Sequence, residues 1–309
     1  PVTPLDTTST GRPLYCQYAL RPSDLLTVAF SSLLFVITAC FFSQIPNAAI
    51  LLIIYFSVGA FPFALARISH VSQTLRVVRD IVFPVLSVLI IFDSLELVVH
   101  YINPQDIDYV LIRLDYALFG MYPTVALEHI MHPFLTDLLQ IAYTTYYFLP
   151  IIIGFSLWWQ GRQKEFSYFV FIMLLCFYLS YIGYLIFPAL GPRYALAHLQ
   201  SSELPGGMIS LVIQSTLNYL EGVKRDAFPS GHTGIAITAL LLTWRLERRL
   251  FVIFFLPVIL LVAATVYCRY HYVIDVLGGL LLVVITLLIG NIYYNFWEKR
   301  HGHPASQNR

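Results

Sequence analysis

The chain has 309 residues, of which 58% are hydrophobic and only 11% are charged, and its formal net charge is +1 at pH 7. Soluble domains are about 45–50% apolar and about 25% charged, so this composition excludes a soluble globule and a disordered tail. A net charge so close to zero gives no electrostatic reason to expect nucleic acid as a partner.

Eight apolar runs approach the length of about 20 residues that a helix needs to cross a bilayer. They lie at 25–42, 48–66, 81–101, 138–159, 166–188, 231–246, 250–268 and 276–297. The runs predict an all-α fold, a polytopic membrane helix bundle with about eight transmembrane helices. We predict two additional helices over 1–80, a six-helix catalytic core over 81–300 and a polar cytoplasmic tail over 301–309.

The distribution of basic residues orients these spans. If the N-terminus is cytoplasmic, Arg113, Arg193, Lys224, Arg225 and Arg269 lie outside, and the other thirteen of the 18 Lys and Arg residues lie inside. Basic residues are enriched in cytoplasmic loops. Both termini are therefore predicted to be cytoplasmic. The long loops 102–137 and 189–230 then face the periplasm, a lumen or the exterior.

The third run carries a polar stripe. Asp93, Glu96 and His100 are spaced three and four apart, so they share one face of a helix. Ionisable residues inside a membrane span usually serve a function. The stripe is predicted to line a lipid pocket or to bind the head group. A proton relay in a transporter or flippase is the alternative.

Loop 102–137 has its own helical pattern. Leu111, Leu114 and Leu118 alternate with Asp108 and Asp115 at near-helical spacing. The pattern predicts an interfacial helix near 105–130, lying flat in the outer interface. A packed surface helix is the alternative interpretation.

The first of three clusters with chemical potential follows the fifth run. Pro188 and Pro192 end the helix, and Gly191 permits a sharp turn. The turn holds Arg193 at the outer mouth, where a planar guanidinium suits phosphate, although an interfacial arginine that only snorkels is equally compatible. Tyr194 beside it is a candidate to line the pocket.

The second cluster opens the run 231–246. Ser230 is a good N-cap, and Gly231 lets a ligand approach the backbone. The N–H groups of a helix start form an anion site, and Lys224 adds positive charge just upstream. His232 then lies on the first turn, beside that site. A capping or surface histidine is the alternative.

The third cluster opens the last run. His271 and Asp275 are four residues apart and share one helix face. The carboxylate would fix one imidazole nitrogen and leave the other free as a nucleophile or base. Arg269 offers a second cation for phosphate, and Tyr270 is a candidate pocket residue. An inactive intrahelical His–Asp pair is the alternative.

The predicted topology brings all three clusters to the same outer face. Two histidines, a carboxylate and arginines without a cysteine nucleophile suit metal-free phosphoryl transfer. His271 would attack phosphorus while Asp275 stabilises it, and protonated His232 would donate to the leaving oxygen. Zinc held by His232, His271 and Asp275 is a less favoured alternative, because the arginines would repel a cation.

These residues resemble the type 2 phosphatidic acid phosphatase superfamily. Pro229-Ser230-Gly231-His232 and His271…Asp275 are similar to its second and third motifs, and the resemblance covers roughly 140–290. It implies an integral-membrane lipid phosphatase or phosphotransferase with a third-motif histidine nucleophile and a second-motif histidine acid. The expected substrate is a lipid phosphate, with no metal, cofactor or nucleic acid.

Two positions differ from the common motifs. Ile186 stands seven residues before Arg193 where a lysine is usual, and Thr265 stands six before His271 where an arginine is usual. The Gly-Pro-Arg and Arg-Tyr-His-Tyr forms are instead similar to the inositol phosphorylceramide synthase branch and its bacterial relatives. That branch transfers a head group to a lipid alcohol, although Gly231 is often bulkier there. A non-catalytic scaffold is disfavoured, because the two histidines and the aspartate are all present.

Overall fold

The computed structural model describes residues 20–220 and 224–301, and no strand occurs in these ranges. The chain divides into two compact units, Pro1–Ile91 and Phe92–Arg309. The proposed tail at 301–309 falls almost wholly outside the described residues. Each unit is described separately below.

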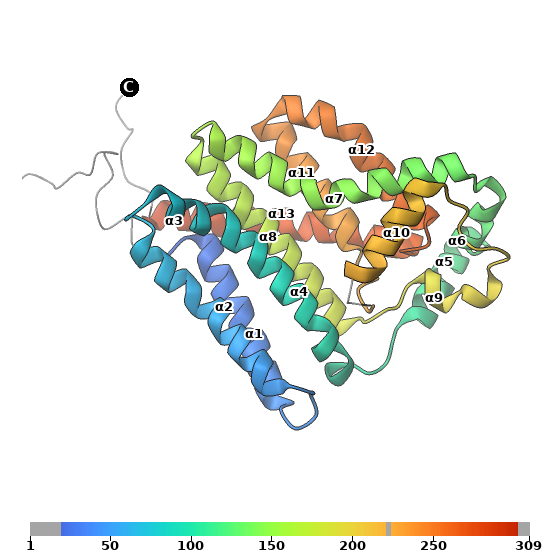
Figure 1. Cartoon of the computed structure of the whole chain (residues 1–309), viewed down its shortest axis with the longest axis horizontal. Coiled ribbons are helices and arrows are strands. Elements are labelled where there is room, and N and C mark those ends of the chain that lie inside the picture. The colour runs from blue at the N-terminus through green and yellow to red at the C-terminus, as the bar shows by residue number, and fades with distance from the viewer. Residues whose placement is uncertain (1–19, 221–223, 302–309) are drawn as a thin grey trace, which may run out of the picture. The chain divides into compact units, whose positions relative to one another are not determined.

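The first unit is built on a helical hairpin of α1 (Pro22–Cys40) and α2 (Ala48–Ile68), which lie side by side (Figure 1). Gly59 of α2 faces Ser31 of α1, and a Cβ at position 59 would lie 2.8 Å from the Ser31 hydroxyl oxygen. A small residue therefore allows the two helices to approach closely. The short helix α3 (Gln73–Val77) and the π-helical turn η2 (Val78–Val82) lead into α4 (Phe83–Ile102), which continues into the second unit.

The second unit is a larger helical bundle. Its elements are the rest of α4, α5 (Asp108–Phe119), α6 (Pro123–Ala126), η3 (Leu127–Ile130), α7 (Pro133–Trp159), α8 (Gln163–Ile186), α9 (Pro192–Ala195), η4 (Ala197–Leu199), α10 (Met208–Leu220), α11 (Gly231–Leu246), α12 (Arg248–Tyr267) and α13 (Val273–His301). The helix α11 is central, because it packs against α7, α8, α12 and α13.

Small residues bring the starts of α11 and α13 together. A Cβ on Gly234 would lie 2.7 Å from the Leu282 side chain, and one on Gly279 would lie 2.7 Å from the Ser230 carbonyl oxygen. Glycine at both positions permits backbone approach that larger side chains would block. The close approach places the second and third sequence clusters next to each other.

Seven described helices are long and apolar enough to cross a membrane. They are Pro22–Cys40, Ala48–Ile68, Gln73–Ile102, Pro133–Trp159, Gln163–Ile186, Arg248–Tyr267 and Val273–His301. The bent pair Asp108–Phe119 and Pro123–Ile130 gives up to eight if it counts as one span. The predicted polytopic helical bundle is confirmed. The run 231–246 is a helix, α11, but its 16 residues are fewer than the about 20 of a typical span.

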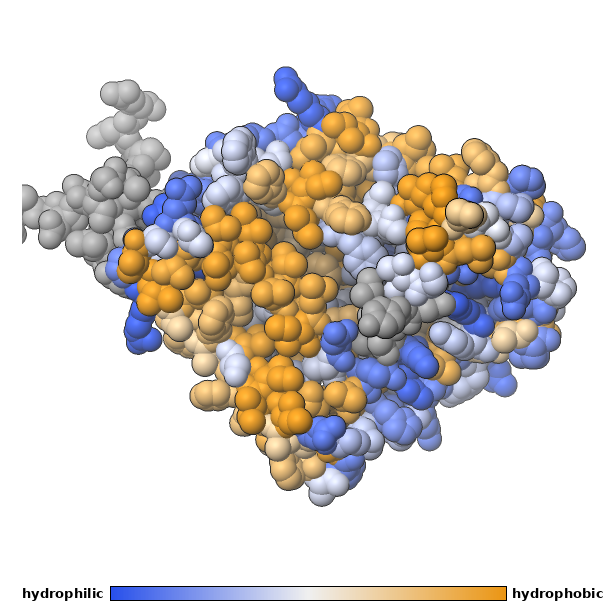
Figure 2. Space-filling model, in the orientation of Figure 1, coloured by the Kyte–Doolittle hydropathy of each residue, from blue (hydrophilic) through white to orange (hydrophobic). Residues whose placement is uncertain are grey.

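The outer faces of the long helices are apolar. Val252, Ile253 and Leu256 of α12 and Leu281 and Ile292 of α13 are all more than half exposed. Figure 2 shows hydrophobic residues over much of the visible face and hydrophilic ones around α5, α6 and α9. Such continuous apolar exposure would be costly in water and fits contact with lipid acyl chains.

A helix is present within loop 102–137, but its two carboxylates do not point outward. In α5, Asp108, Leu111 and Asp115 are buried, whereas Leu114 and Leu118 are exposed. A helix lying on water and lipid would turn its carboxylates to solvent. The carboxylates of α5 are instead directed into the second unit.

Candidate active site

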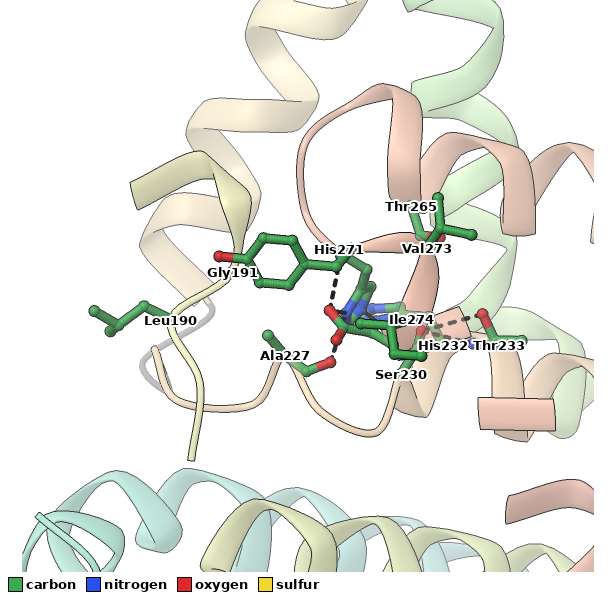
Figure 3. A network of polar contacts seen from close by, with 12 residues as sticks. Leu190, Gly191, Ala227, Ser230, His232, Thr233, Thr265, His271, Val273 and Ile274 are labelled. Carbon is green, nitrogen blue, oxygen red and sulfur yellow. Dashed lines mark hydrogen bonds and ion pairs between the residues drawn. The ribbon is translucent and has the colours of Figure 1, made fainter. Parts of the chain in front are cut away.

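The three sequence clusters meet around two imidazole rings. His232 lies on the first turn of α11, His271 in the turn between α12 and α13, and Asp275 on the first turn of α13 (Figure 3). Nδ1 of His232 is 3.3 Å from Nε2 of His271. Residues separated by 39 positions in sequence therefore form a single pair.

Backbone hydrogen bonds connect the segments that carry the three sequence clusters. The Ser230 N–H donates to the Asp275 carbonyl at 3.0 Å, which joins the starts of α11 and α13. The Ala227 N–H donates to the Ala189 carbonyl at 3.1 Å, which joins the second cluster to the first. The Ser230 side chain also caps α11 by accepting from the Thr233 N–H.

Glycine is required at position 191, where the first sequence cluster contacts the third. Its φ is +86°, and a Cβ there would lie 2.7 Å from the Tyr270 carbonyl oxygen. Only glycine satisfies both the dihedral and the contact without strain. Arg193 follows two residues later at the start of α9, with its guanidinium 5.9 Å from the Tyr194 ring centroid.

The surroundings of His271 fix its tautomer. Nδ1 lies 2.8 Å from the Ala227 carbonyl oxygen and 3.5 Å from Oδ2 of Asp275. Two acceptors on the same side require Nδ1 to carry the proton. Nε2 therefore keeps its lone pair, and this nitrogen faces His232. Asp275 is fully buried and also accepts from the Tyr272 N–H at 2.8 Å.

A tyrosine not singled out from the sequence fixes His232. The Tyr143 hydroxyl lies 2.7 Å from Nε2 of His232. Because Nε2 of His271 is an acceptor, Nδ1 of His232 is the donor between them, and in the neutral ring Tyr143 must donate to Nε2. The Tyr143 ring stacks on Tyr270 at 4.6 Å, and Tyr270 in turn bonds Gln140. One signal in the sequence that could have indicated this residue is the group of polar tips at Tyr143, Tyr146 and Tyr147 within an apolar helix.

The Tyr143 contact gives a testable prediction. Tyr143→Phe is expected to lower kcat about 10-fold with little change in KM, because the hydroxyl orients His232 without touching substrate. Steady-state kinetics on a lipid phosphate measures this. Tyr168→Phe is a matched control, since that hydroxyl lies near the start of α8 and bonds Asn291 of α13, whereas the end of α8 leads into the first cluster. Equal kinetics for Tyr143→Phe and wild type would contradict the tautomer assignment.

Arg269, which the sequence predicts as a second cation for phosphate, has protein partners for its terminal nitrogens. Its terminal nitrogens contact Glu128 at 2.7 Å, Gln200 at 3.0 Å and the Ser202 carbonyl at 2.9 Å. The buried guanidinium thus joins η3 to the chain that follows η4. Its φ of +63° also shows that Arg269 shapes the turn between α12 and α13.

The Arg269–Glu128 ion pair is expected to contribute to stability. Arg269→Gln should cost about 2 kcal/mol, because it removes the charged partner of a partly buried carboxylate and leaves it only the hydrogen bonds from Ser201. The hydrogen bond from Ser201 is the main cause that lowers the pKa of Glu128. A lowered folded pKa stabilises the protein above the unfolded pKa and loses that effect as pH falls through the folded value.

Thermal midpoints measured from neutral to acid pH check this ion pair. Glu128→Gln should reduce the midpoint at neutral pH and flatten its decline at acid pH. A double-mutant cycle with Arg269→Gln should give a favourable coupling between the two residues. An Arg269→Gln protein with a wild-type midpoint would show that the pair is not structural.

Two of the remaining predicted residues, Glu96 and Lys224, contact each other just before the second cluster. The Lys224 N–H donates to Glu96 at 3.0 Å, and Arg225 bonds Asp106 at 2.7 Å and approaches Glu96 to 4.0 Å. Glu96 therefore engages the chain just before the second cluster. Exposed side chains belong to the predicted pocket and phosphate residues Asp93, His100, Tyr194 and Lys224. In 20–220 and 224–301, no group of three His, Cys, Asp or Glu residues is placed to hold a metal.

Comparisons with known proteins point to one family. A sequence model of the PAP2 superfamily matches residues 110–289, which include His232, His271 and Asp275. The chain is 26% identical over 181 residues to a PA-phosphatase related-family protein of Dictyostelium discoideum, which covers 51% of this chain and 32% of that protein. No solved structure matches significantly.

Two further relatives carry synthase names. The inositol phosphorylceramide synthase catalytic subunit of Schizosaccharomyces pombe is 26% identical over 246 residues, covering 73% of this chain and 57% of that protein. Phosphoinositol dihydroceramide synthase of Bacteroides thetaiotaomicron is 26% identical over 226 residues, covering 66% and 72%. The chain thus spans about a third of the Dictyostelium relative and somewhat over half of the yeast one.

Proposed function

The chain belongs to the PAP2 superfamily, and from this premise we propose that it is an integral-membrane lipid phosphatase or phosphotransferase that works through a phosphohistidine on His271. The observation that carries the proposal is the contact between Nε2 of His271 and Nδ1 of His232. An unprotonated nitrogen and a proton donor, held side by side, are the two groups that phosphoryl transfer needs.

The first chemical step uses the lone pair of His271. Nε2 attacks phosphorus, the bond from phosphorus to the alcohol oxygen breaks, and His232, which is protonated on both ring nitrogens in the substrate complex, gives one proton to that oxygen and becomes neutral. Asp275, 3.5 Å from Nδ1 of His271, stabilises the positive charge that develops on the ring. The 3.3 Å between the two nitrogens leaves no room for a phosphoryl group, so substrate must part the rings.

The second step releases the phosphoryl group from His271. Water or a lipid alcohol attacks phosphorus, the N–P bond breaks, and His232, now neutral, takes the proton of the attacking hydroxyl. The phosphate oxygens are proposed to bind the start of α11 at Ser230 and Gly231 and the guanidinium of Arg193. Lys224 adds positive charge at the edge. No metal or cofactor is required in this scheme.

Transfer to a lipid alcohol is a specific second candidate. Relatives named as synthases align with 73% and 66% of this chain, compared with 51% for the phosphatase-related protein. In hydrolysis water accepts the phosphoryl group from His271, whereas in head-group transfer a lipid alcohol accepts a phosphoryl group that still carries its head group. In both, the site is proposed to face away from the cytoplasm, because the basic residues concentrate on the opposite side.

One experiment tests the function and separates its two forms. The purified protein in nanodiscs is incubated with a panel of lipid phosphates and phosphodiesters, with and without lipid alcohols, in the presence of EDTA. Mass spectrometry then identifies inorganic phosphate, freed head group or a new phospholipid as product. Absence of every product across the panel, from a folded protein, would contradict the proposal.

A further inference from the structure

The helix α5 presents an unusual buried face. Asp108 and Asp115 are seven residues apart, two helical turns, so their side chains share one side. They are 7% and 2% exposed, whereas Tyr109 and Tyr116 on the same helix are 64% and 50% exposed. Burying an ionised carboxylate costs several kcal/mol unless hydrogen bonds compensate.

Asp108 holds the loop that carries Arg193. Its Oδ2 accepts from the Leu190 N–H at 2.8 Å, and its Oδ1 accepts from the Gly191 N–H at 2.9 Å. Oδ1 also accepts from the Tyr272 hydroxyl at 2.8 Å. One side chain on α5 therefore connects the first sequence cluster with the residue that follows His271.

Asp115 holds the start of α13. Its Oδ2 accepts from the Val273 N–H at 3.0 Å, and its Oδ1 accepts from the Ile274 N–H at 2.8 Å. These are the first two residues of the helix, so a carboxylate from a distant part of the chain supplies the N-cap. His271 and Asp275 lie on either side of the two amides.

The amides that the two carboxylates accept from flank His271. Figure 3 shows Leu190 and Gly191 on one side of His271, and Val273 and Ile274 on the other. Within the described ranges neither carboxylate has a basic partner within ion-pair distance. Their five hydrogen bonds come from four amides and one hydroxyl, and only a carboxylate offers two acceptor oxygens without a donor.

We propose that Asp108 and Asp115 are positioning residues. Asp108 aligns the loop at 190–191 that leads to Arg193, and Asp115 aligns the proposed nucleophile His271. Asp108 acts through the backbone before Arg193 and so supports phosphate binding. Asp115 acts through the start of α13 and so supports the orientation of His271 and Asp275. The inference rests on the proposed function, and it assigns separate effects to the two side chains.

The test compares Asp108→Asn and Asp115→Asn in the full chain in nanodiscs. An asparagine keeps one acceptor oxygen but directs an NH2 group at a backbone N–H. Each variant therefore loses one hydrogen bond from a backbone amide. Asp115→Asn is expected to lower kcat about 30-fold with KM within about twofold, since small misplacements of reacting groups cost up to about 100-fold. Asp108→Asn is expected to raise KM about 10-fold and to weaken orthovanadate binding equally.

Three comparisons make the result decisive. Arg113→Gln, on the exposed side of α5, should leave kcat and KM within about twofold of wild type. Tyr272→Phe removes one of the three bonds to Asp108, and Asp115→Glu keeps the charge at 115. These two variants replace the asparagine variants if either of those fails to fold. Tyr272→Phe should raise KM by less than Asp108→Asn, and Asp115→Glu should lower kcat by less than Asp115→Asn. Rates are taken per folded molecule from the monodisperse fraction.

The outcomes separate this inference from the proposed function. Folded Asp108 and Asp115 variants with wild-type kcat, KM and vanadate affinity would overturn the positioning role while leaving the function intact. A wild-type protein that binds vanadate but turns over no lipid would contradict the proposed function, and the vanadate affinity of Asp108→Asn would still test the inference. Loss of thermal stability with unchanged kinetics would show that both residues are structural only.

Discussion

Replacing His271 with alanine is expected to lower turnover of lipid phosphates by at least about 10³-fold, because the variant has no nucleophile. The side chain is 3% exposed and its ring is held by Ala227 and Asp275, so its removal takes away both the lone pair and its alignment. The measurement is initial rate on a radiolabelled lipid phosphate, with protein folding checked by size exclusion.

Trapping of the intermediate provides a second readout for His271. Wild type quenched during turnover should carry phosphate that is labile in acid and stable in base, as expected of a phosphohistidine, and His271→Ala should carry none. His198→Ala is a suitable control, because this exposed histidine lies in η4 and has no role in the proposed site. Full turnover by folded His271→Ala would refute the proposed mechanism.

Replacing His232 with alanine is expected to lower kcat by about 10²–10⁴-fold on natural lipid esters, because their alkoxide leaving groups need a proton. The loss should shrink to within about 10-fold on a nitrophenyl phosphate, whose leaving group departs without protonation. Rates on esters of graded leaving-group pKa measure this dependence.

The dependence on the leaving group separates an acid from a merely structural residue. His271→Ala should lose activity on both kinds of ester, whereas His232→Ala should lose it mainly on the alkyl ester. If His232→Ala reduced both rates by the same factor, the ring would only support the site, and the donor would have to be another group.

The sequence alone predicted the helical architecture and the family. Apolar runs near the length of a bilayer locate most helices within a few residues. Pro188, for example, predicts the end of the fifth run, and α8 ends at Ile186. The run 231–246 matches α11 from first to last residue. Such features are local, because a helix satisfies its own backbone hydrogen bonds within the segment. The resemblance to the family followed in the same way, since it rests on two short motifs in order, Pro229-Ser230-Gly231-His232 and His271…Asp275.

The role of individual charges could not be read from local spacing. Arg269 lies two residues before His271 in the sequence, yet its guanidinium pairs with Glu128, which is 141 positions away. Which of several arginines faces an anion depends on where acidic partners are placed by folding. Sequence distance says nothing about that placement.

The same limit applies to α5 and to Tyr143. The alternation of leucine and aspartate predicted a helix near 105–130, and α5 lies within that range at Asp108–Phe119. A hydrophobic pattern, however, assumes that apolar residues point inward. In a membrane protein, leucine side chains can face the lipid. Carboxylates can lie in the interior where they accept hydrogen bonds from backbone amides that would otherwise be unpaired. The direction is set by donors on the loop at 190–191 and on α13, which are 82 and 159 residues away along the chain.

The sequence by itself therefore determined where the helices lie, which residues form the three clusters and which family the chain resembles. The tertiary structure alone decided that the two imidazoles share one hydrogen bond, that Tyr143 fixes one of them and that Asp108 and Asp115 hold their loops. The physical reason is that hydrogen bonds between side chains and distant backbone act over a few ångströms in space, and only the packing of α5, α7, α11 and α13 brings those atoms together.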